Sequence, residues 1–497
     1  MKNNLLKSIA QKIFQVINSN IVLIALLIYF YILCVDLRFI TGDEGYFAYA
    51  SKAILDGKVP YKDFFFPQAF LHPYFLASFN YVIGESWQAF RLFSAIIATG
   101  IGALLFDIIR KKSNTFNAVL GVIIYITSDL VIGYFTIIKN YSLSVFFMLL
   151  ALRVYESKFR YKFFIIGFLL SIVFQIRSYF VVCELVFIAF IFLCNSKKLS
   201  KSNFYMLLLG NFIGILPSLY MLFSYFDEFI FNNLTYHSLR NRAGLITGFH
   251  QKFNTFCSFF HGVKNTGDIS IQFILLFCMM FIKKFDFKNI YFYLTCILFI
   301  ISFLPTPVFS QYFSVVVPFL IIYLFTNNES YLNKQVYKFL TNIILAIYII
   351  NFFVEVQRYA FNGINVSGIY IRKNPTLWRP KNLDAQIENI ASRLYFKEGK
   401  GSLKVFSSWP GYLIGMKAKS VKGLENHFAR NIAHKLSKED LIKYKVYYSE
   451  NDLSNLISNK NYKYLILGFR DKKRNWQRLA RKSGYKYTNY KIIKFLY

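Results

Sequence analysis

Adjacent carboxylates that could perform acid–base chemistry occur at two places in residues 1–355: Asp43-Glu44 and Asp227-Glu228. The first pair follows a long apolar run by a few residues. Two neighbouring carboxylates beside an apolar surface can have their pKa values pushed apart, which leaves one of them ionised as a base. For the pair alone, the alternative is a solvated turn after a helix.

The composition around the first pair favours a functional segment over a simple connector. Residues 41–50 are expected to lead into a short helix, and residues 54–68 mix aromatic side chains, glycines and carboxylates. Long loops of this content are usually functional. Three side chains of the segment are candidates for contact with a substrate: Tyr46, Asp63 and His72. For His72, an ordinary structural histidine is the alternative.

Several cations are candidates for binding a phosphate group. Arg177 lies between two apolar runs, where a charge is costly without a partner, and a guanidinium pairs well with a phosphate. The alternatives are a snorkelling arginine or an arginine paired with Glu184. The weaker cationic candidates are Lys139, Arg240 and Arg242, for which a solvated loop position is the alternative. A further candidate for contact with a substrate is His237, for which a structural role is the alternative.

The elements that must position these residues are long apolar runs. A spanning helix usually needs about 20 predominantly apolar residues, and several of the runs are slightly shorter. The runs cover residues 21–37, 88–109, 116–134, 137–152, 162–178, 179–195, 204–226, 269–283, 289–304, 308–326 and 336–355. They predict an α-helical polytopic membrane protein with about 11 spans.

The basic residues between the runs predict the orientation of the chain. With the N-terminus inside, every inner loop carries Lys or Arg, as the positive-inside rule requires. The outer parts are then 38–87, turns near 135–140 and Arg177, 227–268, 305–307 and everything after 355. Residues 68–84 could span the membrane, but the distribution of charge favours an outer or re-entrant position.

The overall composition excludes several classes of protein. Of the 497 residues, 56% are hydrophobic, and the mean hydropathy is +0.39. These values rule out a set of soluble domains and a disordered chain. The formal net charge is +33, yet nucleic acid is not an expected partner, because basic residues between apolar runs are what membrane topology requires.

Residues 1–355 are predicted to form a transmembrane domain. The tail, residues 356–497, is predicted to be a separate soluble, basic α/β domain on the outer face. It holds 29 Lys+Arg and 9 Asp+Glu, a balance of +20 that favours an anionic lipid surface or acidic glycan. A helix is expected over 384–395. Strands are expected at 405–406, 464–469 and 487–497, and helix starts at Ser437 with Asp440 and at Ser449 with Asp452.

Three side chains of the tail are candidates for contact with a substrate. Trp409 and Tyr412 could stack on a sugar, and His427 could contact an acceptor. Core packing and turn formation are the alternative for all three. The tail contains no GxGxxG, P-loop or HExxH motif.

Two consecutive stretches carry a family resemblance. The run DEGYFAYASKAILDGKVPYKDFFFPQAFLHPYF, followed by GESWQAFRLFSAIIATG, resembles the GT-C membrane glycosyltransferases of the dolichyl-phosphate-mannose protein mannosyltransferase type. Bacterial relatives of that type include the lipid A aminoarabinose transferases. The resemblance is strong over 41–110, looser over 163–320, and includes nothing specific in the tail.

The resemblance implies roles for individual residues. Asp43 matches the first-loop catalytic aspartate of the family and Glu44 its acidic neighbour. Gln311 and Tyr312 resemble a late outer-loop segment that lies near the lipid carrier in the family, and as bare residues they could instead cap a helix start. The family often places a further acid in the next outer turn. Residues 138–141 read Ile-Lys-Asn-Tyr, so no cofactor is expected with certainty and a divalent metal is left open.

The resemblance also implies an activity. Such enzymes take a sugar from a polyprenyl-phosphate carrier and transfer it, on the outer face of the membrane, to a lipid, glycan or protein. We expect an inverting displacement with Asp43 as base, in a multi-pass protein of the inner membrane. The alternatives are a transporter or flippase of a lipid-linked sugar, which would show internal repeats, and a non-enzymatic scaffold that presents the basic tail.

Overall fold

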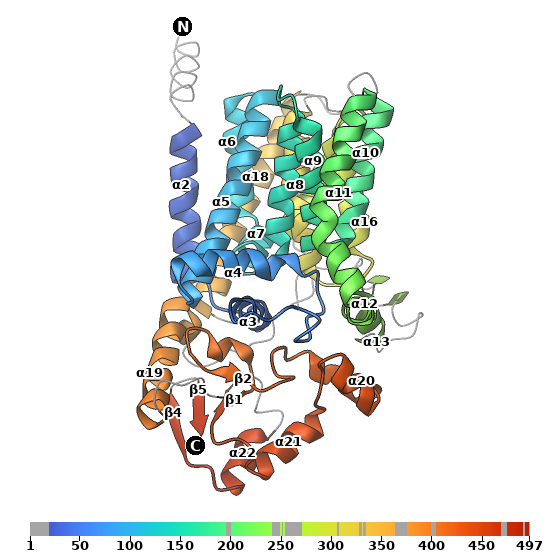
Figure 1. The fold of residues 1–497 in the computed structure, drawn as a ribbon. Coiled ribbons are helices and arrows are strands. Elements are labelled where there is room, and N and C mark those ends of the chain that lie inside the picture. The colour runs from blue at the N-terminus through green and yellow to red at the C-terminus, as the bar shows by residue number, and fades with distance from the viewer. Residues whose placement is uncertain are drawn as a thin grey trace. The chain divides into compact units, whose positions relative to one another are not determined.

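The structure, a computed structural model, is mostly helical (Figure 1). It describes residues 19–194, 200–240, 249–250, 252–253, 271–305, 308–327, 331, 334–362, 375–398, 404–468, 475–490 and 493–496.

The chain divides into two compact units, each built from separate stretches of sequence. The first unit contains residues 1–34, 94–216 and 243–358, and the second contains 35–93, 217–242 and 359–497. Residues 38–87 and the tail, which are far apart in sequence, therefore belong to the same unit. A separate soluble domain over residues 356–497 on the outer face stays a prediction.

The first unit is a bundle of apolar helices, which lie side by side in Figure 1. Its helices are α2 Ser19–Tyr31, α6 Thr115–Thr127, α7 Asp129–Tyr134, α8 Asn140–Tyr155, α9 Lys162–Ile176, η2 Ser178–Phe180, α10 Val181–Cys194, α15 Ile271–Ile282, α16 Ile290–Ser302, η5 Ser310–Val315, α17 Val317–Thr326 and α18 Lys334–Gln357. Four described helices are divided between the units: η1 Ile32–Leu37, α5 Trp87–Lys112, α11 Lys201–Ser224 and η6 Arg358–Asn362.

Four described helices are long and apolar enough to cross a membrane: Asn20–Leu37, Trp87–Lys112, Lys201–Ser224 and Lys338–Phe361. Seven shorter apolar helices accompany them, over 115–127, 140–155, 162–176, 178–193, 271–282, 290–302 and 310–326. Each apolar run of the sequence overlaps one of these helices. The number of spans stays a prediction, because the shorter helices fall below the length that usually crosses a bilayer.

Small residues and buried amides join the helices of the first unit. A β-carbon at Gly167 of α9 would overlap the backbone of α11 at Leu207, so the two helices approach closely there. The side chain of Gln272 in α15 donates to the carbonyl oxygens of Thr127 (3.2 Å) and Tyr348 (3.1 Å). Such hydrogen bonds satisfy buried polar groups and fix helices that share no strong hydrophobic attraction.

The second unit combines short helices with one sheet. Its helices are α3 Glu44–Leu55, α4 Leu71–Ile83, α12 Phe226–Ile230, η4 Phe231–Thr235, α13 Tyr236–Arg240, η7 Pro375–Trp378, α19 Pro380–Glu398, η8 Pro410–Leu413, η9 Ala429–Asn431, η10 Ala433–Lys435, α20 Lys438–Lys443, α21 Glu450–Ser458 and α22 Trp476–Lys482, and η6 Arg358–Asn362 begins at its boundary. Its strands are β1 Lys404–Ser407, β2 Lys419–Ser420, β3 Leu465–Leu467, β4 Tyr487–Tyr490 and β5 Ile493–Leu496.

The sheet has the order β2-β1-β3-β5-β4. Strand β1 is parallel to β2 and β3, and β5 is antiparallel to β3 and β4. The first two predicted strands are confirmed by β1 and β3. The run 487–497 is not one strand, as the sequence suggests, but two that pair with each other, since strands in globular sheets usually run only about 5–6 residues.

The tail has a hydrophobic core and capped helices of its own. Phe406 of β1, Leu465 of β3 and Trp476 of α22 are completely buried in one cluster. Both expected helix starts are confirmed, because Ser437 accepts from the amide of Asp440 and Ser449 forms a capping box with Asp452. The same tail contains residues 416 and 420, which form hydrogen bonds with Lys52 and Tyr49 of α3.

Candidate active site

The carboxylate pair lies at the start of α3. Asp43 is half-buried, whereas Glu44 is completely buried. The amide of Thr41 donates to Glu44 Oε1 (2.6 Å), and the amide of Glu44 donates to the carbonyl oxygen of Thr41 (3.2 Å). This reciprocal pair of hydrogen bonds closes a turn ahead of α3, and the helix dipole favours the negative charge of Glu44 in its first turn.

The buried Glu44 is neutralised by an arginine that the sequence reading does not single out. Arg91 Nε lies 2.8 Å from Glu44 Oε2, and its Nη2 donates to Glu44 Oε1 (2.8 Å) and to the carbonyl oxygen of Phe39 (2.7 Å). Both charged side chains are 0% exposed. A charge within an apolar run signals a buried partner, so the position of Arg91 in the run 88–109 could have marked it.

Aromatic side chains surround the start of α3. The ring of Tyr46 lies 6.2 Å from that of Phe66, 6.1 Å from His427 and 5.5 Å from Phe428, centroid to centroid. Tyr46 and His427 are both buried. The tail therefore supplies two rings to the neighbourhood of the carboxylate pair, which favours the packing alternative for His427.

Tyr236 of α13 is a buried residue on which both Asp43 and a cation act electrostatically. Burial raises the pKa of the Tyr236 hydroxyl to about 12, with Arg240 lowering it and Asp43 raising it further. The Asp43 carboxylate and the Arg240 guanidinium therefore both lie within electrostatic range of this hydroxyl. Arg240 also lies over the ring of Phe428, 5.7 Å from its centroid.

The remaining candidates of the second unit lie in different surroundings. Asp63 is exposed and accepts from the amide of Val59 (2.7 Å), so it closes a turn. His72 is completely buried with its ring 4.9 Å from that of Phe47. His237 is exposed beside Tyr236. Arg242 lies outside the described residues.

A second group of candidates gathers in the first unit around Arg177. This guanidinium donates to Asn140 Oδ1 (2.6 Å) and lies over the rings of Tyr141 (3.8 Å) and Tyr179 (4.3 Å). It is buried, and its Nε has no hydrogen-bond partner among the described residues. The predicted alternative partner, Glu184, accepts instead from Asn211.

Three more predicted residues adjoin this cluster. Lys139 precedes Asn140 and donates to Gln311 Oε1 (2.7 Å). Tyr312 follows Gln311, and its backbone carbonyl accepts from Ser302 (2.9 Å). The ends of α8 and α9 and the helix η5 thus bring four separately predicted residues together: Lys139, Arg177, Gln311 and Tyr312. Two buried cations at one place suit an anionic group.

The second carboxylate pair and a metal centre are the other possibilities for chemistry. Asp227, of the second carboxylate pair, is exposed and forms an ion pair with Lys443 (2.6 Å). Within the described ranges, no three His, Cys, Asp or Glu side chains are grouped as a metal site would need. The first pair therefore remains the candidate for acid–base chemistry.

The comparisons with known proteins agree on the fold. Residues 67–221 match the family model of dolichyl-phosphate-mannose-protein mannosyltransferase. The structure is similar to two crystal structures of ArnT from Cupriavidus metallidurans, one bound to undecaprenyl phosphate (TM-score 0.61) and one in the apo state (TM-score 0.59). In both, the sequence identity is 12% over 96% of this chain and 97% of that chain. Curated protein sequences gave no match. The chain has a GT-C mannosyltransferase-type fold, as expected.

Proposed function

We propose that this protein is a membrane glycosyltransferase that moves a sugar from a polyprenyl-phosphate carrier to a lipid, glycan or protein of the cell envelope. The GT-C fold, the match of residues 67–221 to a mannosyltransferase family, and the undecaprenyl phosphate bound by the similar ArnT support this proposal. The basic inner loops favour a cytoplasmic N-terminus and an extracytoplasmic tail in the inner membrane.

Asp43 acts as the base. It takes the proton of the acceptor hydroxyl as that oxygen attacks the anomeric carbon, and the bond from that carbon to the phosphate oxygen breaks, so the configuration inverts. The observation that carries this assignment is the contrast within the pair. Glu44 is buried and neutralised by Arg91, whereas Asp43 stays partly exposed and within electrostatic range of Tyr236. Glu44 holds the backbone from which Asp43 projects.

The cluster around Arg177 binds the carrier phosphate. Its guanidinium is held by a neutral amide and two rings, so its charge is available for a phosphate oxygen. Lys139 adds a second positive charge, and Arg240 and Arg242 are weaker candidates. Cations that already point at the phosphate stabilise the negative charge that develops as it leaves, without reorganisation.

The remaining predicted contacts take supporting roles. Tyr46 packs against Phe428 one turn after the base in α3. His237 is exposed and packs against Tyr236. Gln311 orients Lys139 in the phosphate cluster, and Tyr312 follows Gln311 in η5. The turn that Asp63 closes and the packing of His72 shape the outer segment.

The test replaces the base and follows the product in the cell envelope. We expect Asp43→Asn to accumulate like the wild type but to lower the transfer rate about 10²- to 10⁴-fold, as the loss of a general base does. Mass spectrometry of envelope glycans compares cells with the wild type, cells without the protein, and cells with the variant. Asp227→Asn is the matched control, since it alters the other, exposed carboxylate pair and is expected to transfer normally.

Two outcomes would contradict the proposal. Envelope glycans that are identical with and without the wild-type protein would overturn the activity. Full transfer by Asp43→Asn, with the product present at the wild-type level, would overturn the assignment of the base and leave the activity standing.

A further inference from the structure

The tail residue Trp409 makes a hydrogen bond at the residue that precedes the proposed base. Its indole Nε1 donates to the carbonyl oxygen of Gly42 (2.8 Å), across 367 residues of sequence. Trp409 is 0% exposed, so this ring does not stack on a sugar, and the packing alternative for it is correct. The bond fixes the peptide that links Gly42 to Asp43.

The ring that makes this bond is itself held firmly. It stacks on Trp87 with the planes 8° apart and the centroids at 5.4 Å, and Trp378 and Tyr412 pack against it at 5.8 and 5.0 Å. The indole nitrogen of Trp87 donates to the carbonyl oxygen of Gly411 (3.2 Å). A donor locked by such packing keeps its position better than one on a mobile loop.

The same ring covers the first turn of α3. A β-carbon at Gly45 would fall inside the van der Waals radius of the Trp409 indole, whose nearest atoms belong to its five-membered ring and the adjoining Cζ2. Only glycine leaves room for this contact. The helix start that carries Asp43 is therefore shaped to receive Trp409.

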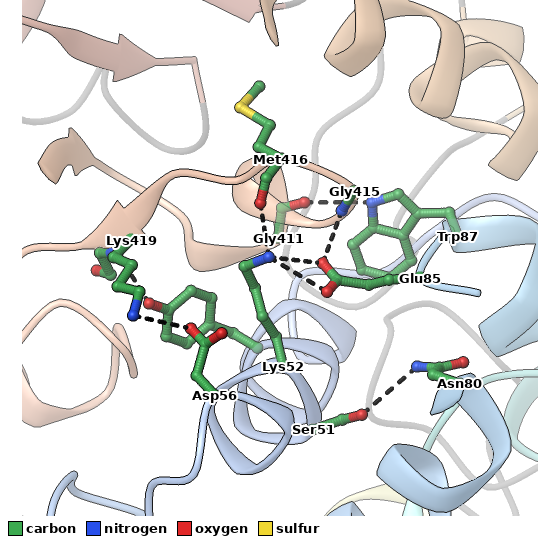
Figure 2. Close-up of polar contacts among 12 residues, drawn as sticks. Ser51, Lys52, Asp56, Asn80, Glu85, Trp87, Gly411, Gly415, Met416 and Lys419 are labelled. Atoms are coloured by element: carbon green, nitrogen blue, oxygen red, sulfur yellow. Dashed lines mark hydrogen bonds and ion pairs between the residues drawn. The ribbon is translucent and has the colours of Figure 1, made fainter. Parts of the chain in front are cut away.

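The tail also holds α3 further along its length. Lys52 Nζ donates to the carbonyl oxygen of Met416 (2.6 Å) and forms an ion pair with Glu85 (3.0 Å), which in turn accepts from the amide of Gly415 (2.7 Å). Figure 2 shows Met416 and Glu85 both meeting Lys52, and the amide of Gly415 meeting Glu85. In addition, the hydroxyl of Tyr49 accepts from the amide of Ser420 (2.8 Å). Residues 409–420 thus contact α3 from its first turn to its last.

We propose that Trp409 is a positioning residue for Asp43, and that residues 409–420 make the tail a required part of the transfer site. This inference rests on the proposed function. A reacting group displaced by about 1 Å can lose about 10²-fold in rate. The hydrogen bond to Gly42 and the contact at Gly45 restrain the backbone on both sides of Asp43, so their loss lowers turnover without removing any group that touches the substrate.

The experiment compares two buried tryptophans of the tail. Trp409→Phe removes the hydrogen bond to Gly42 and keeps a ring, while Trp476→Phe removes a similar bond to Ser454 (3.2 Å) inside the tail core. We expect Trp409→Phe to lower kcat about 10- to 100-fold with the KM for undecaprenyl-phosphate sugar unchanged. Trp476→Phe is expected to keep the kcat of the wild type. Hydrogen–deuterium exchange of residues 39–47 in the full-length protein should rise only in Trp409→Phe.

A second pair of variants tests the contact at Gly45. Gly45→Ala alone is expected to lower turnover, because its methyl group meets the indole. In a Trp409→Ala background, the same change should cost much less, which a double-mutant cycle measures as coupling. An additive result would overturn the contact as a positioning device.

The outcomes separate this inference from the proposed function. Unchanged exchange of residues 39–47 and an unchanged kcat in Trp409→Phe would overturn the positioning role, even while Asp43→Asn still lowers the transfer rate about 10²- to 10⁴-fold. If the wild type transfers no sugar, the proposed function fails, and increased exchange in Trp409→Phe alone would keep only the restraint on the backbone at Gly42.

Discussion

Arg91 and Arg177 are both buried arginines, but they have different kinds of partner. Arg91 is held by the carboxylate of Glu44 with two short contacts. Arg177 is held by a neutral amide and two aromatic rings, and no carboxylate among the described residues forms an ion pair with it. A buried charge that the protein itself neutralises serves structure, whereas one left with neutral partners suits an external anion.

Arg91→Ala tests the structural role of Arg91, the first half of this comparison, and should have the largest effect, a loss of stability. The change leaves the Glu44 carboxylate buried without its cation, which typically costs about 3–5 kcal/mol of stability. We expect a much lower melting temperature in detergent and little accumulated protein. The double variant Arg91→Ala/Glu44→Gln removes the uncompensated charge and should recover part of the loss. A melting temperature equal to the wild type in Arg91→Ala would contradict the structural role.

Arg177→Ala should test the second half, with an effect on binding and not on folding. Hydrogen bonds to charged groups contribute about 1.5–3 kcal/mol, so the affinity for undecaprenyl phosphate should fall roughly 10- to 150-fold. Binding of undecaprenyl phosphate to the purified protein measures this. Arg153→Ala is the control, because Arg153 already pairs with Asp107 (2.6 Å). Equal affinity in Arg177→Ala and the wild type would remove Arg177 from the carrier site.

Asp384 extends the comparison to a carboxylate that forms no ion pair with a cation among the described residues, and its expected effect is the smallest. It accepts from the amides of Trp87 (2.8 Å) and Gln88 (3.1 Å) at the start of α5, and burial, the largest influence, raises its pKa to about 6. Because the pKa is higher in the folded state, the folded protein gains from protonation, and stability falls as pH rises from about 4 to 6.

Asp384→Asn keeps an acceptor for the two amides but does not titrate. The melting temperature of this variant relative to the wild type should therefore rise between pH 4.5 and 7, by the equivalent of about 1 kcal/mol for a partly exposed carboxylate. Thermal melts in detergent across this range provide the measurement. A difference that is constant with pH would show that Asp384 has the same pKa in the folded and unfolded states.

Local patterns in the sequence predicted the elements well. The apolar runs, the helix starts at Ser437 and Ser449, and the strands β1 and β3 depend on neighbouring residues, so composition and spacing reveal them. The sequence also predicted Lys139 and Arg177 as candidate phosphate ligands, because a charged side chain in or beside an apolar run needs a partner.

The contacts that complete the candidate site depend on distant residues. In the sequence, Glu44 is simply the acidic neighbour of the candidate base Asp43. Its structural role becomes visible only because Arg91, 47 residues away, forms an ion pair with it. From the sequence, Trp409 could stack on a sugar or pack in the core, with core packing favoured. Nothing near it in sequence indicates that its indole meets Gly42, since such a partner is set by tertiary packing and not by local propensity.

The hydrogen bond between Trp409 and Gly42 has a consequence for how the protein is made. The two residues are separated by 367 positions, and synthesis proceeds at about 5–20 residues per second. Roughly 20–70 s therefore pass between the appearance of Gly42 and that of its partner. During translation, residues 38–87 are made long before Trp409, so the hydrogen bond to Gly42 forms only after residue 409 has been synthesised. If the proposed positioning role of Trp409 holds, transfer by a newly made chain begins only once this contact has formed.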